Sequence, residues 1–456
     1  MFSQFQQQEG SALITVLLII TVITILIGVF STAFILRLRF IRNSINQMQA
    51  QYIAEAGIYK TLWLLSQKDG YRLASNKKNH SIPLFEGQAG AVTIDRWGGY
   101  YDVKSSAIFR NQQYTAHAIA GETIPPELDY AVMLGSNVHP LVISGRTEIN
   151  GNIAVGKKGV KNTSRFNHGM AVPGNIEIRK ELQLPYFNPV DFQNTIQDFK
   201  HLINSTNGSH IDGNLVIDPS MHLTDEIIHV SGNIIIECTD DKTMIDLVEG
   251  MMLIAVGDVH ISSAARLGHR LQIVCSGQIE IDADVSFDDN ILYAERGIHL
   301  SAACKGNVQI ISNGLIIIDG NSTLSYPSVI YSGKDTRLKK LGLGIRIHGG
   351  SSVFGAVIHW HRVSNLKTLR DNTISVIIEA GAKVDGLVYN IGDTMFEGEV
   401  SGMIATRQFR NVAGSTVYIN RLDDVIINRS IMGNRAILPL SFHPNARYGI
   451  LNWVYE

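Results

Sequence analysis

The chain has 456 residues, a formal net charge of -2, 45% hydrophobic residues and 18% charged residues. This composition is that of a folded protein with a large core, and it excludes a disordered chain. Because acidic and basic residues nearly balance and no long basic tract occurs, the sequence predicts no binding to nucleic acid.

An uncharged segment, SALITVLLIITVITILIGVFSTAFIL, occupies residues 11–36. At about 1.5 Å per residue, a helix of this length spans about 39 Å, enough to cross a hydrocarbon core of about 30 Å. The preceding residues, MFSQFQQQEG, contain no Lys or Arg, which disfavours an ordinary secretory signal peptide. The segment is therefore predicted to be a transmembrane helix.

An amphipathic pattern continues the helix through residues 37–66. Its apolar stripe recurs every three or four residues and consists of Leu38, Ile41, Ile45, Met48, Tyr52, Ala56, Tyr59, Leu62 and Leu65. No proline interrupts it before Pro83. We expect one continuous helix of roughly 55 residues, with Gly28 and Gly57 as possible bend points.

Two short motifs on this helix carry a family resemblance. The residues Glu9-Gly10-Ser11-Ala12-Leu13-Ile14 and the segment AQYIAEAG at 50–57 resemble the start of PilX-type minor pilins and of tip pseudopilins of type II secretion. The resemblance implies that residues 1–10 are a leader peptide. A prepilin peptidase would cut between Gly10 and Ser11 and methylate Ser11.

The resemblance also implies partners and a compartment. The helix would sit in the lipid of the inner membrane and pack against other pilin-like subunits, and the body would be periplasmic or extracellular. Thr15 stands where most pilins carry a glutamate, which favours a minor or tip position. Arg37, Arg39 and Arg42 follow the apolar segment, and the positive-inside rule taken alone would place the body in the cytoplasm.

Residues 67–125 are predicted to form a small antiparallel β meander packed on the helix. The strand-like segments AVTIDRW and YYDVKSSAIF flank Gly98-Gly99, and YTAHAIAGE follows the polar segment RNQQ. A Gly-Gly pair between two such segments is a strong hairpin signal. Together with the helix, this region would make a pilin-like α+β unit that ends at Pro125-Pro126.

Residues 126–440 reuse one phrase, a glycine that is followed by an aliphatic run, often with a small polar residue between them, and its steps between Gly213 and Gly297 are 19, 25, 20 and 20 residues. It occurs at Gly151, Gly174, Gly213, Gly232, Gly257, Gly277, Gly297, Gly306, Gly355, Gly386 and Gly402. This pattern predicts a right-handed parallel β-helix, a β-solenoid, with a helical insertion near 185–206 and a C-terminal tail at 441–456. The basic stretch 334–346 is interpreted as a solvated loop.

Candidate chemical groups are few. His359 and His361 would share one face of a strand and are weak candidates for a metal pair, with only His348 nearby as a third ligand. We therefore predict no metal and no cofactor. The three cysteines, Cys238, Cys275 and Cys304, form no CxxC pair and are interpreted as small buried residues.

One acidic corner contains Asp282, Asp284, Asp288 and Asp289. Paired carboxylates on adjacent coils could cut a sugar chain or hold calcium. We interpret this corner as an outward-facing turn that keeps the solenoid soluble, so no catalytic residue is predicted.

The sequence thus predicts a non-enzymatic structural component of a type IV pilus-like filament or secretion pseudopilus, displaying a β-solenoid for adhesion or assembly. One alternative is a membrane-anchored cytoskeletal polymer resembling bactofilins, which the arginines after the span favour. The other is a carbohydrate-active β-helix enzyme held at the cell envelope.

Overall fold

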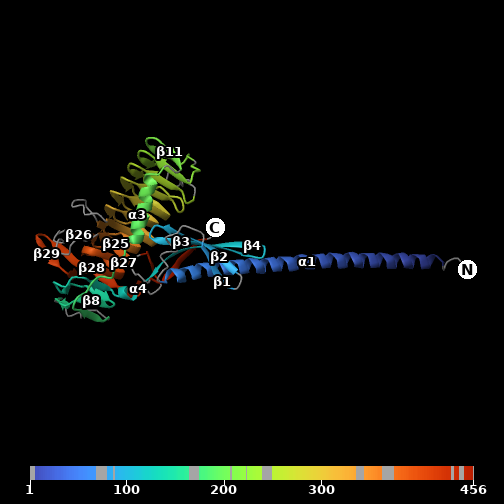
Figure 1. The fold of residues 1–456 in the computed structure, drawn as a ribbon, viewed down its shortest axis with the longest axis horizontal. Coiled ribbons are helices and arrows are strands. Elements are labelled where there is room, and N and C mark those ends of the chain that lie inside the picture. The colour runs from blue at the N-terminus through green and yellow to red at the C-terminus, as the bar shows by residue number, and fades with distance from the viewer. Residues whose placement is uncertain are drawn as a thin grey trace.

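The computed structural model describes residues 6–67, 80–85, 88–163, 174–205, 208–221, 223–238, 249–334, 344–361, 374–432, 436–440 and 446–454. It has three parts: a long projecting helix, an antiparallel sheet wrapped against the helix at its C-terminal end, and a stack of parallel strands (Figure 1). Most of the basic stretch 334–346 lies outside the described residues.

Helix α1 (Gln6–Leu65) is a single α-helix of 60 residues, so the predicted continuous helix is confirmed. It runs through the backbone of Gly10 and Ser11 without a break. Three hydroxyls in the apolar part donate to carbonyls four residues earlier at 2.8 Å, those of Thr21, Thr24 and Thr32. These bonds satisfy the polar groups within the helix, which suits an apolar surrounding.

The head sheet (β1–β4, β32 and β33) packs on the last five turns of α1. Its first strands are β1 (His80–Phe85), β2 (Gln88–Trp97), β3 (Tyr100–Phe109) and β4 (Gln112–Thr123), each antiparallel to the next. The helix contributes Ile53, Ile58 and Leu62 to the shared core. At Gly57 a Cβ atom would clash with the Ser105 hydroxyl, so this glycine permits close helix–sheet packing.

The C-terminal residues return to the head sheet. Strands β32 (Ile437–Leu438) and β33 (Tyr448–Val454) pair antiparallel with β4. Within the segment predicted as a C-terminal tail, residues 448–454 thus form a strand of the head sheet. The physical reason is that β4 would otherwise leave a long unpaired sheet edge, which β33 covers.

The solenoid (residues 132–428) is a large, solenoid-like array of parallel strands. Its longest row contains, in order of pairing, β11 (Ser209–Ile211), β13 (Ile227–Val230), β15 (Met252–Ala255), β17 (Gln272–Cys275), β19 (Ser286–Ala294), β21 (Lys305–Ser312), β23 (Thr323–Lys334), β25 (Ser352–His361), β27 (Lys383–Phe396), β28 (Glu399–Ala413), β5 (Val132–Leu134), β8 (Ile153–Gly156) and β10 (Ile176–Arg179).

A second row contains β12 (Leu215–Ile217), β14 (Ile234–Ile236), β16 (Val259–Ile261), β18 (Gln278–Ile281), β20 (Gly297–Leu300), β22 (Leu315–Ile318), β24 (Gly344–Ile347) and β26 (Ile374–Ile378). The shorter elements are η1 (Pro126–Leu128), β6 (Leu141–Ser144), β7 (Glu148–Asn150), β9 (Val160–Asn162), β29 (Thr416–Ile419), β30 (Arg421–Asp423), β31 (Ile426–Asn428) and α4 (Arg429–Met432). Because each strand pairs with the strand one coil away, the array is stacked coil on coil.

The order of coils in space differs from their order in the chain. Strand β5 pairs with β28 near the end of the chain, and β8 and β10 continue the stack beyond it. Helix α3 (Val190–Ile203) then runs back along the outside of the stack to β11 at the opposite end (Figure 1). The helix predicted near 185–206 is thus present, and it returns the chain along the stack.

The repeated Gly-polar phrase has a direct structural cause. The side-chain carbonyl of Asn214 accepts a hydrogen bond from the backbone N–H of Asn233 at 2.9 Å. The Asn233 side chain repeats this bond to Asp258 at 2.8 Å, and Asp258 repeats it to Gln278 at 2.9 Å. A Cβ atom on Gly257 would clash with the Asn233 side chain, so the glycine makes room for the bond.

The interior of the solenoid is a continuous aliphatic core. Ile228, Leu253 and Ile273 occupy one inward row on successive coils and are buried. Cys275 and Cys304 are buried and free in the same core, which agrees with their interpretation as small apolar residues.

Candidate functional site

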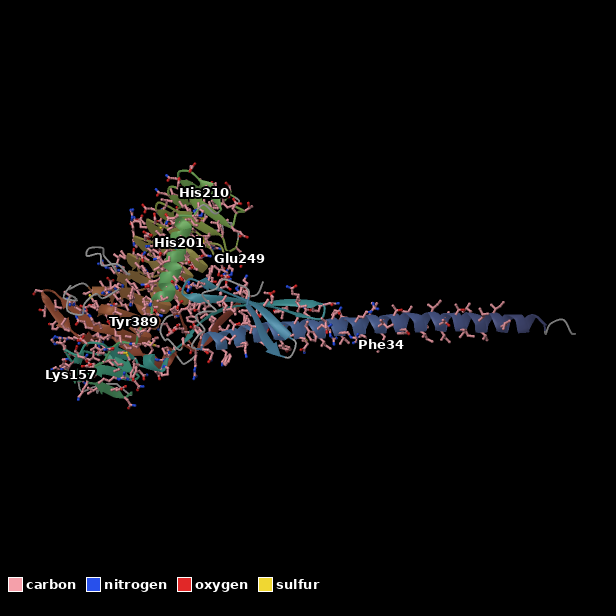
Figure 2. The ribbon with its side chains drawn as sticks, in the orientation of Figure 1. Phe34, Lys157, His201, His210, Glu249 and Tyr389 are labelled. Carbon is pink, nitrogen blue, oxygen red and sulfur yellow. The ribbon has the colours of Figure 1, made fainter. Side chains whose placement is uncertain are left out.

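The first candidate site is the exposed apolar part of α1. Its large side chains project into solvent from Leu13 onward, with Phe30 71% exposed and Phe34 61% exposed. Figure 2 shows Phe34 on the part of the helix that no other element covers. In the part of the chain that the structure describes, one helix, within Leu13–Leu65, is therefore long and apolar enough to cross a membrane.

A polar boundary separates this apolar part from the head sheet. Arg37, Arg39 and Arg42 are exposed on the helix, and Asn46 is the first buried residue of α1 that the structure describes. Arg110 at the β3–β4 turn donates to the Asn46 side chain at 3.5 Å. The three arginines thus lie between the apolar surface and the folded body.

A second candidate site joins the head sheet to the solenoid. The turn between β2 and β3 inserts against strand β21, where the Gln309 side chain binds its backbone on both sides. The Gly99 N–H donates to Gln309 Oε1 at 2.7 Å, and Gln309 Nε2 donates to the Trp97 carbonyl at 3.1 Å. A Cβ atom on Gly98, which has φ of +59°, would clash with the Gln309 side chain. The Gly-Gly pair is therefore needed both for the turn and for this contact.

Arg270 is the central charge of this joint. Its guanidinium lies 2.7 Å from an Asp102 oxygen, 3.7 Å from an Asp289 oxygen and 4.0 Å from the centre of the Trp97 ring. The Trp97 indole N–H donates to Asp289 at 3.1 Å, and His117 contacts the other Asp102 oxygen. The head sheet and the solenoid therefore share one buried, hydrogen-bonded charge network.

The two carboxyls of this network have opposite pKa shifts. Burial alone would raise the pKa of Asp102, but the hydrogen bonds and positive charges of His117 and Arg270 lower it overall. Burial raises the pKa of Asp289, and the hydrogen bond from Trp97 and the charge of Arg270 offset only part of that rise. Asp102 is thus the stronger anionic partner of Arg270.

Aromatic side chains fix α3 along the solenoid. Phe192 stacks on Tyr331 with ring centres 4.2 Å apart and planes 5° apart, and Phe199 packs on Tyr293 at 5.2 Å. The Tyr389 hydroxyl donates to the Pro185 carbonyl at 2.8 Å. The three tyrosines lie on alternate strands of one outward row, with an isoleucine between each pair.

Helix α3 also contacts the head sheet. The Thr195 hydroxyl donates to the Gly98 carbonyl at 3.0 Å, and Arg96 lies 3.3 Å from Asp191. Trp97, Phe192 and Tyr331 belong to one hydrophobic cluster. Head sheet, α3 and solenoid therefore pack as one body, from which the apolar part of α1 projects (Figure 2).

The histidine pair lies on strand β25. His359 Nε2 and His361 Nδ1 are 3.2 Å apart, a hydrogen bond between the two rings. His359 is 1% exposed, and burial lowers its pKa to about 3. Among the described residues, no group of three or more His, Cys, Asp or Glu side chains is arranged to hold a metal. His359 is thus a buried, neutral residue of the solenoid, and His361 is its half-buried neighbour.

The four aspartates of the acidic corner have separate surroundings. Asp282 lies 3.4 Å from His260 and Asp288 lies 3.2 Å from His269, both at the surface. Asp284 occupies a turn with φ of 62°, and Asp289 belongs to the Arg270 network. The corner is therefore divided between surface ion pairs, a turn and the joint with the head sheet.

The residues of the joint were not identified from the sequence. Arg270 and Gln309 lie far from Trp97 along the chain, and no local pattern marks them. The tyrosine row could have been identified from the sequence. Tyr293, Tyr331 and Tyr389 each follow an aliphatic run at the same position of the coil. An aromatic at an outward position of a repeated coil indicates a surface that another element covers.

No family model, curated protein or solved structure matches the chain. The functional assignment therefore depends on the geometry of the molecule and on the resemblance of its N-terminal motif.

Proposed function

We propose that the chain is a minor or tip subunit of a type IV pilus-like filament or of a related secretion pseudopilus. Its role is structural and non-enzymatic. After prepilin peptidase cuts between Gly10 and Ser11, α1 packs among the helices of other pilin-like subunits. The solenoid, a right-handed parallel β-helix, is then displayed outside the cytoplasm for adhesion or assembly, and the precursor is held in the inner membrane.

The observation that carries the proposal is the division of α1 into two parts. Residues Leu13–Leu36 expose their apolar side chains, whereas Ile53, Ile58 and Leu62 are buried under the head sheet. A helix that is apolar on all sides needs lipid or other helices around it. The same helix can therefore move from a membrane into a helical filament core while the head sheet stays folded on its other half.

The residues near both ends of the apolar part agree with a minor position. Thr15 leaves no carboxylate in the apolar part, so the subunit carries no charge that must pair with a neighbour's N-terminus. Arg37, Arg39 and Arg42 lie where lipid headgroups would meet the helix, and lipid phosphates offer them partners.

A processing assay tests the proposal. The full chain is expressed with and without a prepilin peptidase, and mass spectrometry identifies its N-terminus. We expect N-methylated Ser11 as the first residue in the presence of the peptidase, and an intact chain for the Gly10→Val variant. A chain that keeps Met1 in the presence of active peptidase, while a control pilin is cut, contradicts the proposal.

A second function is favoured by one specific observation. The exposed arginines Arg37, Arg39 and Arg42 follow the apolar part, and no Lys or Arg precedes it. The positive-inside rule then places the solenoid in the cytoplasm, as for a membrane-anchored, bactofilin-like polymer. A fluorescent reporter that is active only in the cytoplasm, fused after Glu456, distinguishes the two functions: fluorescence supports the polymer and its absence supports the filament subunit.

A further inference from the structure

Both ends of the longest strand row are open within the described residues. Strand β10 pairs only with β8, and strand β11 pairs only with β13. Figure 1 places β11 at one end of the stack and β8, the neighbour of β10, at the other. Among the described strands, none pairs with the outer edge of β10 or of β11, so each end of the row is an open strand edge.

At the β10 end, core positions are uncovered. Ile176 and Ile178 pair with Ile153 and Val155, which are buried in the solenoid core. Ile176 is nevertheless 38% exposed and Ile178 is 59% exposed. These two side chains have the inward position of every coil below them, but no strand that the structure describes covers them from above. An additional coil at this end would bury both.

The two ends carry opposite charge. Around β10 the exposed cationic residues are Lys157, Lys158, Lys161, Arg179 and Lys180, against the two acidic residues Glu177 and Glu181. Around β11, residues 208–226 contain no Lys or Arg, and their acidic residues are Asp212, Asp218, Asp225 and Glu226. Figure 2 shows Lys157 and His210 at opposite extremes of the stack. An end-to-end contact between two copies would bring these charges together.

The strand register defines the contact residue by residue. Ile176, Ile153 and Val132 are aligned on successive coils at one end of the stack. The same row of aligned residues ends at the opposite end of the stack with Ile228 and Ser209. Continuing it from one copy to the next places Ser209 opposite Ile176. Ile211 then stands opposite Ile178, Asp212 opposite Arg179 and His210 opposite Glu177. Three of the four pairs match in chemistry or in charge, Ile211 with Ile178, Asp212 with Arg179 and His210 with Glu177, and the small Ser209 side chain lies opposite Ile176.

We propose that copies of this chain stack head to tail, with β10 of one copy paired in parallel with β11 of the next. Such a contact is heterologous and open, so it builds a row of copies and not a closed dimer. The helix α1 projects sideways from the stack (Figure 1), so all helices of a row can enter one membrane or one bundle. This inference depends on the solenoid ends alone and not on the proposed cleavage at Ser11.

Disulfide trapping tests the register in the full chain in detergent micelles. Cα atoms on paired strands are about 4.8 Å apart, within the range that a disulfide bridges. The variant carries Ile178→Cys and Ile211→Cys, with Cys238→Ser to remove the half-buried native thiol. On mild oxidation we expect a ladder of cross-linked dimers, trimers and larger species. The matched control, Ile178→Cys with Val216→Cys, places the second thiol on the neighbouring face of the same coil and should give no ladder.

A charge exchange adds a second readout. Arg179→Asp alone and Asp212→Arg alone should each lower the cross-linked yield several-fold, because each creates a like-charge contact, and the two together should restore it. A cross-linking pair that stays monomeric while circular dichroism shows native structure overturns the proposal. Equal ladders from the Ile211 and Val216 variants, or no rescue by the double exchange, also overturn it. The processing of Gly10-Ser11 is measured separately, so either proposal can fail alone.

Discussion

The two parts of α1 differ in what surrounds them, although they belong to one uninterrupted helix. Residues Leu13–Leu36 expose apolar side chains on every side, whereas residues 46–65 bury one face under the head sheet and expose the other. The first part carries no charge, and the second carries Glu55 and Lys60 on its partly exposed surface. The difference shows that a folded body needs an amphipathic helix, while a helix that is apolar all round needs an apolar environment outside the chain.

The largest effect is expected at the joint between the head sheet and the solenoid. Arg270→Leu leaves the buried carboxyls of Asp102 and Asp289 without their cation and should cost about 3–5 kcal/mol of unfolding free energy. Arg266→Leu, at an exposed position on the same loop, should change it by less than about 0.5 kcal/mol. Urea denaturation of the full chain in detergent measures both. Equal stability of the two variants would mean that the network does not hold the parts together.

The packed part of α1 should be sensitive to truncation of its side chains and the apolar part should not. Ile58→Ala removes a fully buried side chain from the helix–sheet core and should cost about 3 kcal/mol of unfolding free energy. Ile27→Ala, at a position 61% exposed, should leave the unfolding of the body unchanged. Denaturation followed by tryptophan fluorescence compares them. A similar loss for both variants contradicts the division of the helix.

Membrane insertion, in contrast, should depend on the apolar part of α1 and not on the residues beyond it. Ile27→Arg places a charge in the apolar part and should disfavour insertion by about 2.5–3.5 kcal/mol, while the head sheet and solenoid stay folded. Ile45→Arg, at an exposed position beyond the apolar part, serves as the control and should insert normally. The fraction of protein resistant to alkaline extraction from membranes measures the effect. Unchanged extraction of Ile27→Arg means that the apolar part does not reside in lipid.

The smallest expected effect is a pH dependence of the unfolding free energy, and it arises from a histidine of the solenoid. Burial lowers the pKa of His359 to about 3, so the folded state keeps this ring neutral while the unfolded chain takes up a proton near its ordinary pKa of about 6.5. The unfolded state thus binds more protons below that value, and stability falls as the pH drops from about 6.5 toward 3. At pH 5 the loss should be roughly 2 kcal/mol, at about 1.4 kcal/mol per pH unit.

His359→Asn tests this assignment, because asparagine already occupies the next coil of the same row at Asn390. The variant should lose that part of the pH dependence, whereas His260→Asn, at a partly exposed position, should retain it. Chemical denaturation at pH 7 and pH 5 measures the difference for each protein. If the His359→Asn variant keeps the full pH dependence of stability, that dependence comes from another group.

Much of the fold could be predicted from the sequence because its signals are local. The uncharged segment, the hairpin glycines Gly98 and Gly99, and the Gly-Asn phrase each identify an element by short-range physical chemistry. The path of the chain could not be predicted. Each coil looks alike, so nothing local indicates that β5 pairs with β28 or that α3 returns the chain to the far end.

The joint between the head sheet and the solenoid could not be predicted from the sequence for the same reason. Asp289 looked like one residue of a surface acidic corner, and only the fold brings Trp97 and Arg270 to it. Likewise, a strand at residues 448–454 depends on the free edge of β4, which lies more than three hundred residues earlier in the chain. Contacts between distant segments, not local preferences, decide these features.

The compartment of the body tests the central claim most directly. In a Cys238→Ser background, Lys158→Cys places one exposed thiol on the solenoid, far from α1. A membrane-impermeant maleimide is added to spheroplasts before and after lysis. A filament subunit anchored by its N-terminal helix predicts full labelling before lysis. Labelling only after lysis, with a periplasmic control protein labelled before it, would place the solenoid in the cytoplasm and contradict the account.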